Sequence, residues 1–338
     1  MKNISQIKPQ KLLFICSVIS LLLLFQSCEK DESADSKLDT NLDSKLDSNL
    51  VGSWKITEDG SKAPWGIAID SEGNVYFSEL YGNGISKFTS AGTLVTHWGT
   101  NGSGNGQFNM PKHIAIDGEG NVYVADEENQ RIQKFTSSGA YITQWGNPDS
   151  GVDMWAPGSV TADIVNNWVY VVDVYNRLQK FDLSGNFITQ WGGTGTGDGQ
   201  LMLGNQSDPF NQSPCGQMAV DTIGNVYVVD NHNSRIQKFT SSGTFLMKWG
   251  GKGSEGGQFM YPFGIVIDNK NGFIYVSDNS LLDNEGNIAR IEKFDLSGNF
   301  IKQWVLNVQN QAIGALAVDH EGHVLAVVGG NLCIYDFN

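Results

Sequence analysis

Short apolar runs alternate with polar turns along residues 51–338, and this alternation repeats about every 47 residues. Each copy opens with an apolar run that ends in an aspartate, and the six aspartates are Asp70, Asp117, Asp163, Asp221, Asp268 and Asp319. A turn follows each aspartate, usually Gly-Asn, and most copies then continue with three more short runs, the last of which ends in tryptophan. No stretch shows sustained helical periodicity, so each copy is predicted to form four short antiparallel strands.

The two ends of the repeat region complement each other. The tryptophans that close the fourth runs are Trp54, Trp98, Trp145, Trp191, Trp249 and Trp304, and Trp54 precedes the first complete copy. The last copy, residues 313–337, lacks a fourth run, and residues 49–55 (NLVGSWK) resemble residues 299–305 (NFIKQWV). Four strands per repeat of this length are typical of a propeller blade. We therefore predict an all-β, six-bladed β-propeller of four-stranded antiparallel blades, in which an N-terminal strand completes the last blade and removes exposed strand edges.

The repeat itself resembles a known family. Its consensus reads P-x-G-I-A-x-D-x-x-G-N-V-Y-V-x-D-x-x-N-x-R-I-Q-K-F, and residues 214–239 match it with one extra residue after the proline. This pattern is similar to the NHL repeat. The resemblance implies a six-bladed propeller and leaves the function open, because similar propellers serve as protein-binding scaffolds, RNA binders, lyases and lactonases. The first and last blades depart from the pattern, with Glu79 in place of the second aspartate and Gly329-Gly330-Asn331 without an arginine.

The first 48 residues have a different character. Residues 1–27 combine three lysines with an apolar run over residues 12–25, which is short for a membrane span. Ser27 then precedes Cys28, an arrangement that resembles a bacterial lipoprotein signal peptide with cleavage before Cys28 and palmitate or a related lipid on its sulfur. We expect residues 28–48 to be an acidic flexible tether and residues 49–338 to be the propeller. The expected location is the cell envelope, on the periplasmic side of the outer membrane or on the cell surface.

The charge of the chain narrows the class of partner. The formal net charge is −14, and removal of residues 1–27, with three lysines and no acidic residue, leaves −17. Such a surface repels phosphate backbones and anionic lipids. We therefore expect no nucleic-acid partner and membrane contact only through the anchor. Cys215 and Cys333 fall in different blades, so we expect no disulfide between them. Stability is therefore expected to come from packing and ring closure.

Several recurring polar features have a structural interpretation. The six aspartates are expected to close their turns by accepting hydrogen bonds from the following backbone. The Asp126, Asn129 and Arg131 set recurs as Asp230, Asn233 and Arg235, which indicates a shared structural contact rather than one recognition site. Glycine-rich stretches at 99–108, 192–201 and 250–259 precede no helix, so they are not phosphate-binding loops. Their Gln-Phe or Gln-Leu ends are predicted to insert between blades.

Loop length indicates which face of the propeller binds a ligand. The longest insertions, residues 194–213 and 279–288, fall on the face that carries the blade-to-blade connections and the loops between second and third strands. Long loops on a rigid scaffold commonly form binding sites, although surface loops also tolerate insertions at little energetic cost. The candidate ligand-binding residues on this face are Trp65, Tyr81, His113, Trp155, Tyr175, His232 and Phe263. An aromatic rim of this kind is suited to stacking on sugar rings or to anchoring a peptide.

Two functions remain open. The leading hypothesis is a lipid-anchored, extracytoplasmic scaffold that binds a protein, peptide or glycan, with no catalytic residue and no cofactor assigned. The alternative is a metal-assisted lyase or a lactone or ester hydrolase, with zinc or calcium held by His113 and His232. Since such a site commonly needs three protein ligands, a carboxylate from an inserted loop would complete it, and the candidates are Asp198, Asp208 and Asp283. No serine or cysteine has a recognisable nucleophile setting.

Overall fold

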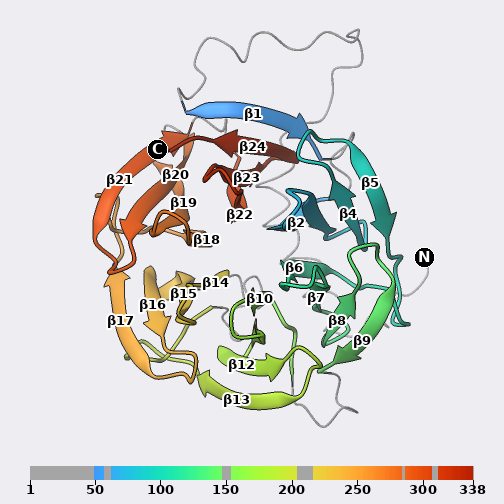
Figure 1. Cartoon of the computed structure of the whole chain (residues 1–338). Coiled ribbons are helices and arrows are strands. Elements are labelled where there is room, and N and C mark those ends of the chain that lie inside the picture. The colour runs from blue at the N-terminus through green and yellow to red at the C-terminus, as the bar shows by residue number, and fades with distance from the viewer. Residues whose placement is uncertain are drawn as a thin grey trace, which may run out of the picture.

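The computed structural model describes residues 49–56, 62–146, 154–203, 216–283, 286–306 and 311–337. The predicted signal peptide, tether and Cys28 lie outside these residues. The described chain forms six four-stranded sheets around a central channel (Figure 1), and every strand pairing is antiparallel. The predicted six-bladed β-propeller is thereby confirmed.

Each blade runs from the channel outward in chain order. The inner strands are β2 (Pro64–Ile69), β6 (Pro111–Ile116), β10 (Ser159–Asp163), β14 (Met218–Val220), β18 (Pro262–Asp268) and β22 (Ile313–Val318). The second strands are β3 (Val75–Glu79), β7 (Val122–Asp126), β11 (Trp168–Val172), β15 (Val226–Asp230), β19 (Phe273–Asp283) and β23 (Val324–Val328). The third strands are β4 (Gly84–Phe88), β8 (Arg131–Phe135), β12 (Arg177–Asp182), β16 (Arg235–Phe239), β20 (Gly286–Asp295) and β24 (Asn331–Tyr335). The outer strands are β5 (Leu94–Trp98), β9 (Tyr141–Trp145), β13 (Phe187–Gly192), β17 (Phe245–Gly250), β21 (Phe300–Leu306) and β1 (Leu50–Lys55).

Strand β1 closes the ring. It lies outside β24 in the sheet ordered β1-β24-β23-β22, and Trp54 stands opposite Leu332 (Figure 1). Beyond the ladder, Asp336 N donates to Asn49 O at 2.9 Å and Asn49 Nδ2 donates to Asp336 O at 2.8 Å. The predicted completion of the last blade by the N-terminal strand is confirmed.

The hydrophobic core lies between blades. Each of the six buried clusters joins two neighbouring blades, as when Phe108 and Phe135 of the second blade pack with Tyr76 and Ile85 of the first. Because both faces of every sheet are covered, second strands such as VYVVD at residues 226–230 are apolar on both sides. The predicted insertion of the connector ends is confirmed, since Phe108, Leu201 and Phe259 are fully buried.

The tryptophans of the outer strands lock the blades together. Five of the six pack on a glycine in the third turn of the next blade, and the pairs are Trp54–Gly92, Trp98–Gly139, Trp145–Gly185, Trp191–Gly243 and Trp249–Gly298. At the sixth junction Trp304 stacks on Phe337 instead, with ring centroids 4.2 Å apart. The tryptophans are therefore structural markers of the blade boundaries.

The aspartates that mark each repeat cap the first turn, as predicted. Asp70 Oδ1 accepts hydrogen bonds from Glu72 N at 3.0 Å and Asn74 N at 2.9 Å, and Oδ2 accepts from Tyr76 Oη at 3.0 Å. Lys87 Nζ lies 3.2 Å from Oδ2. Burial by itself raises the pKa of Asp70, but the hydrogen bonds from Asn74 and Tyr76 and the Lys87 ammonium outweigh that effect and lower the pKa.

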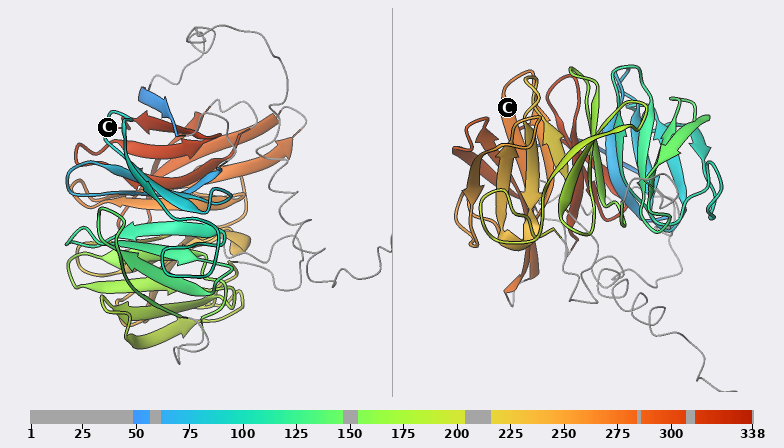
Figure 2. Two further views of the ribbon diagram at one scale, coloured as in Figure 1. Left: turned by 90° about the vertical axis from the view of Figure 1, so that its right-hand side faces the viewer. Right: turned by 90° about the horizontal axis from the view of Figure 1, so that it is seen from below.

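The connections define two faces. We call the face with the blade-to-blade connections and the second-to-third-strand loops the loop face, and the opposite one the turn face. The sequence predicts a loop over residues 279–288, but β19 and β20 continue through it, with Ser280 paired to Ile288 and Asp283 to Gly286. Figure 2 shows this hairpin (orange) projecting beyond the other blades. Within the described ranges, no helix is long and apolar enough to cross a membrane.

Candidate functional site

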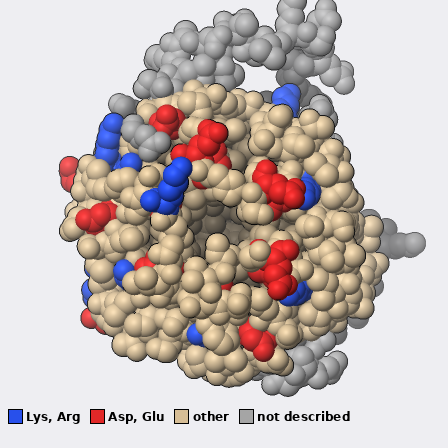
Figure 3. Space-filling view, viewed as in Figure 1, with Lys and Arg blue, Asp and Glu red and all other residues tan. Residues whose placement is uncertain are grey.

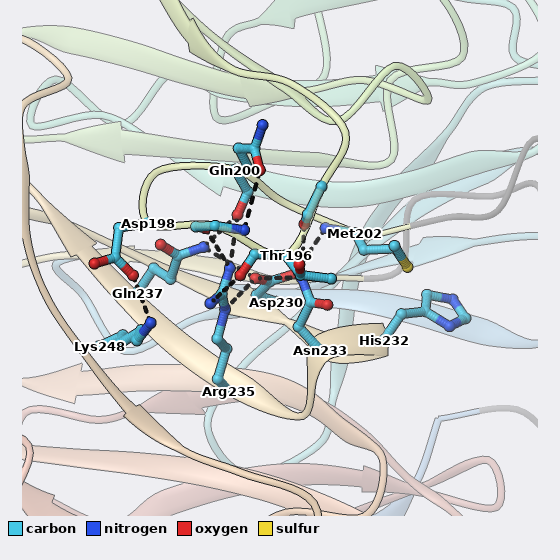
Figure 4. Close-up of polar contacts among 12 residues, drawn as sticks. Thr196, Asp198, Gln200, Met202, Asp230, His232, Asn233, Arg235, Gln237 and Lys248 are labelled. Atoms are coloured by element: carbon cyan, nitrogen blue, oxygen red, sulfur yellow. Dashed lines mark hydrogen bonds and ion pairs between the residues drawn. The ribbon is translucent and has the colours of Figure 1, made fainter.

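The loop face is built on a repeated polar cluster that fixes its connectors (Figure 4). In the fourth blade Asp230 accepts hydrogen bonds from Arg235 Nε at 2.7 Å, from Asn233 Nδ2 at 2.9 Å and from Met202 N at 2.7 Å. The Arg235 guanidinium in turn donates to carbonyls of the glycine-rich connector, including Gln200 O at 2.9 Å. The same contacts recur around Asp126 in the second blade. The predicted structural role of these sets is confirmed.

At the channel mouth, three candidate residues gather across the ring. Trp65 of the first blade lies 5.7 Å from Phe263 of the fifth, and His113 of the second blade lies 6.3 Å from the same phenyl ring. Lys112 places its ammonium 3.9 Å from the centroid of Trp65 and 3.4 Å from Glu127 Oε2. This set of five residues is called the channel-mouth cluster.

Most of the channel-mouth cluster is buried. Trp65 is 7% exposed, His113 3% and Lys112 3%, whereas Phe263 is half-buried. Inside the protein, the Lys112 ammonium is therefore compensated by the Glu127 carboxylate and by the face of the Trp65 ring. The cluster closes the loop side of the channel, so the aromatic rim that the sequence predicts does not include an exposed Trp65.

His113 is the least satisfied polar group of the cluster. Its Nδ1 lies 3.0 Å from Ser159 Oγ, and its buried Nε2 has no hydrogen-bond partner among the described residues. Burial lowers the pKa of His113 to about 3, and the Lys112 ammonium contributes in the same direction. The imidazole is therefore neutral at physiological pH.

Deeper in the channel, Gln217 links three blades. Its Oε1 accepts hydrogen bonds from Ile265 N at 3.0 Å and Leu316 N at 3.3 Å, and its Nε2 donates to Leu316 O at 3.2 Å. The side chain thus runs from the fourth blade to inner strands of the fifth and sixth. With the channel-mouth cluster, it makes the centre of the loop face a packed floor.

The exposed aromatic side chains lie elsewhere on the loop face. Trp155 is 40% and Tyr175 39% exposed, and their ring centroids are 6.2 Å apart at 76°. Arg177 Cζ lies 5.1 Å from the Tyr175 centroid. On other blades, Tyr81 is 38% exposed and Tyr261 is 44% exposed. Tyr261 is absent from the sequence-based candidates, although it directly precedes Pro262, the residue before the candidate Phe263, at the entry to the same inner strand.

The remaining candidates do not converge. Figure 4 shows His232 and Asp198 on opposite sides of the Asp230–Arg235 pair, and Asp198 Oδ1 lies 2.5 Å from Lys248 Nζ. Asp208 falls outside the described residues, and Asp283 ends strand β19. In the part of the chain that the structure describes, no three histidine, cysteine or acidic residues form a group that could hold a metal ion.

Sequence and structure comparisons agree on the repeat and the fold. The NHL repeat profile matches residues 108–135, which span the end of one connector and the first three strands of the second blade. Peptidyl-glycine alpha-amidating monooxygenases A and B of Xenopus laevis are 35% and 34% identical over 123 residues. Those matches cover 33% of this chain but only 12% and 13% of the two relatives.

Solved propellers with low sequence identity share the architecture. Virginiamycin B lyase from Staphylococcus aureus superimposes with a TM-score of 0.55 at 13% identity, over 85% of this chain and 99% of the lyase. A Bacteroides thetaiotaomicron protein of unknown function gives a TM-score of 0.60 at 18% identity, over 84% of this chain and 72% of that protein. At these identities the likeness shows the fold alone. The chain is thus a six-bladed propeller that contains NHL repeat sequence.

Proposed function

We propose that this NHL-repeat propeller is an extracytoplasmic binding protein, anchored by lipid at Cys28, that holds a protein, peptide or glycan on its loop face. The observation that carries the proposal is the exposed pair of Trp155 and Tyr175, whose rings meet edge to face 6.2 Å apart. Rigid aromatic side chains with one polar edge give large contact area at little cost in conformational entropy.

The scaffold under this pair is preorganised. Asp173 is buried and accepts hydrogen bonds from Tyr175 N at 3.0 Å and Arg177 Nε at 2.9 Å. Asn176 follows Tyr175 in the same loop, and its Oδ1 accepts a 2.6 Å hydrogen bond from Leu203 N. A ligand that stacks on Trp155 therefore meets a loop whose conformation is already fixed, which reduces the ordering cost of binding.

The central residues of the loop face support the same proposal. The channel-mouth cluster and Gln217 form a floor in which the Lys112 charge is already paired with Glu127. A ligand is therefore expected to lie across the loop face, between the aromatic positions of different blades, rather than deep in the channel.

Metal content separates this proposal from the alternative, a metal-assisted lyase or hydrolase. Elemental analysis of the purified protein is expected to find no stoichiometric divalent metal. One zinc or calcium per chain that survives dialysis and is lost in His113→Ala would overturn the binding function. His320→Ala is the matched control, because His320 lies on a turn of the opposite face.

The anchor is tested separately. Mass spectrometry of the N-terminal peptide from membranes is expected to find a lipid-modified Cys28 as the first residue. Cys28→Ala should release the protein from the membrane fraction. An unmodified peptide that begins upstream of Cys28 would contradict the anchor and leave the loop-face proposal intact.

A further inference from the structure

The turn face carries an exposed position that makes the same backbone hydrogen bond in all six blades. This position is the second residue after each repeat aspartate, and its N–H donates to that aspartate's Oδ1 at 2.9–3.1 Å. Its occupants are Glu72, Glu119, Val165, Ile223, Lys270 and Glu321, and all of them are exposed. The fold therefore fixes the backbone here and leaves the choice of side chain free.

Side-chain type at this position is segregated around the channel. The third and fourth blades are adjacent and carry Val165 and Ile223, and Ile164 precedes Val165 in the same turn. Ile164 is 60%, Val165 56% and Ile223 79% exposed. We call these three residues the apolar arc.

The opposite side of the ring is acidic. The sixth, first and second blades carry Glu321, Glu72 and Glu119 at the same position, and these three residues form the acidic arc. Figure 3 shows acidic side chains gathered on one side of the central opening and only scattered charged side chains across from them. Among the described residues, no lysine or arginine forms an ion pair with any of the three glutamates, and Glu321 Oε2 lies 3.6 Å from His323 Nδ1, a pair that is ionic only when the imidazole is protonated. Their charges are therefore available to a partner.

Hydrogen bonds link the turn-face edges of the fourth, fifth, sixth and first blades. His320 Nε2 lies 3.2 Å from Asp70 O, and Lys270 Nζ donates to His320 O at 3.3 Å. Asn269 Nδ2 donates to Val220 O at 3.2 Å, which joins the fifth turn to the fourth blade. These bonds connect the blade that carries Ile223 to the blades that carry Glu321 and Glu72, so members of the two arcs are held by one hydrogen-bonded series of turns.

The apolar arc has no structural explanation. Glutamate occupies the same position in three blades whose turns close as the Ile223 turn does, with the aspartate carbonyl bonded to a left-handed glycine, so that turn does not require an aliphatic residue. Covering an exposed isoleucine or valine removes apolar surface from water, which favours the complex. Three such side chains on the turns of two neighbouring blades therefore offer a partner an apolar contact.

The acidic arc indicates the chemistry of that partner. An anionic lipid surface would be repelled by the three glutamates. A second copy of this strongly acidic chain would bring like charges together. A segment with an apolar stripe and lysine or arginine beside it satisfies both arcs at once.

We propose that the turn face is a docking surface for a basic amphipathic segment of a partner protein. The apolar side chains of the segment cover Ile164, Val165 and Ile223, while its cations face Glu72, Glu119 and Glu321. The surface lies opposite the loop face, so the propeller can hold this partner and its loop-face ligand together.

Fluorescence anisotropy with a labelled synthetic peptide tests the proposal. The probe is an amphipathic helix of leucine and lysine, added to the detergent-solubilised full-length protein. We expect binding that weakens at least tenfold in Ile223→Ser, and several-fold in Glu72→Gln/Glu119→Gln/Glu321→Gln with loss of its salt dependence. Val305→Ser and Glu255→Gln are the matched controls, because both residues are exposed and lie toward the loop face, Val305 near the end of outer strand β21 and Glu255 in a blade-to-blade connector.

The alternatives give distinct results. Equal binding of a scrambled peptide with the same composition, or of Ile223→Ser, would overturn the proposal. Binding to neutral phosphatidylcholine vesicles that Ile223→Ser abolishes would assign the arc to a membrane. A dimer in sedimentation that Ile223→Ser dissociates would assign it to a second copy. Trp155→Ala is expected to bind the peptide as the wild type does. A failure of the turn-face proposal can therefore be told apart from a failure of the loop-face function.

Discussion

The indole of Trp54 lies against the backbone of Gly92, so the strand that completes the last blade is also packed onto the first. A Cβ atom on Gly92 would stand 2.8 Å from Trp54 Cγ, closer than two carbon atoms approach. The same contact joins Trp98 to Gly139 one blade later. Trp54 is therefore an ordinary blade-boundary tryptophan supplied from the other end of the domain, which couples the two ends energetically.

Deleting residues 49–56 should destabilise the whole propeller. The deletion removes the β1–β24 ladder, exposes the edge of β24 and uncovers the core cluster between the last and first blades. A loss of about 4 kcal/mol corresponds to a fall of roughly 10 °C in melting temperature for a domain of this size. Thermal unfolding followed by circular dichroism checks this, and an unchanged melting temperature would refute the closure.

Gly92→Ala isolates the tryptophan contact itself. Gly92 has φ +82°, and Gly73 in the same blade has φ +83° but no atom within 4 Å of a Cβ. Both substitutions carry the cost of a left-handed backbone, about 1 kcal/mol, whereas only Gly92→Ala also displaces Trp54. Gly92→Ala should therefore lose about 1–3 kcal/mol more in urea unfolding than Gly73→Ala. Equal losses would mean that the contact carries no energy.

Arg235→Ala should be far more damaging than Lys248→Ala. Arg235 is buried against the fully buried Asp230, so its removal leaves an uncompensated carboxylate at a cost of about 3–5 kcal/mol. Lys248 pairs with Asp198, and both side chains are about half exposed (44% and 55%), so that pair is worth well under ~1 kcal/mol. Similar unfolding free energies for the two variants would contradict the structural role given to the Asp–Arg set.

Glu292 replaces the glutamine found at this position in blades two to four. In the second blade Gln133 Nε2 donates a hydrogen bond to Asp126 Oδ2 at 3.0 Å. An ionised Glu292 has no hydrogen to donate to the corresponding buried carboxylate, Asp278. Burial raises the pKa of Glu292 to about 7, and the Asp278 charge adds to this rise. A hydrogen bond from Gly257 N at 2.6 Å and the Arg290 guanidinium oppose it.

Stability should consequently depend on pH through Glu292. Its folded-state pKa lies above the ordinary value of 4.5, so its stabilising contribution is complete below pH 4.5 and is lost as pH rises through about 7. Glu292→Gln should remove this dependence and stabilise the protein at pH 8 by about 2 kcal/mol. Denaturant unfolding of both proteins at pH 5 and pH 8 checks this. A variant that is less stable at both pH values would show that the carboxylate is required.

The repeat pattern predicts the blades because each blade uses the same local contacts. The turn aspartates, the turn glycines and the Asp–Asn–Arg sets all act within one repeat or between neighbours, so their spacing is visible in the chain. Trp54 was informative for the same reason, since its flanking residues match those of the other outer strands.

The site was less predictable because its contacts cross the ring. Position in the repeat places Trp65 on the loop face, but its burial depends on Lys112 of the next blade and Phe263 of the fifth. Gln217 reaches Leu316 across 99 residues of sequence. Such contacts depend on side-chain direction in the closed ring, which no single repeat contains. Likewise, the β19–β20 hairpin lacks the repeat pattern from which the other strands could be predicted.

The binding function proposed for the loop face depends on Trp155 and Tyr175. It is tested most directly by screening the wild-type protein on glycan and envelope-peptide arrays and measuring the affinity of the strongest hit by calorimetry. Trp155→Ala should weaken that affinity at least tenfold, since a stacked indole contributes about 1–3 kcal/mol or more at an interface, while Ile142→Ala, equally exposed on an outer strand, should leave it unchanged. An affinity that is the same for the wild type and Trp155→Ala would contradict the account.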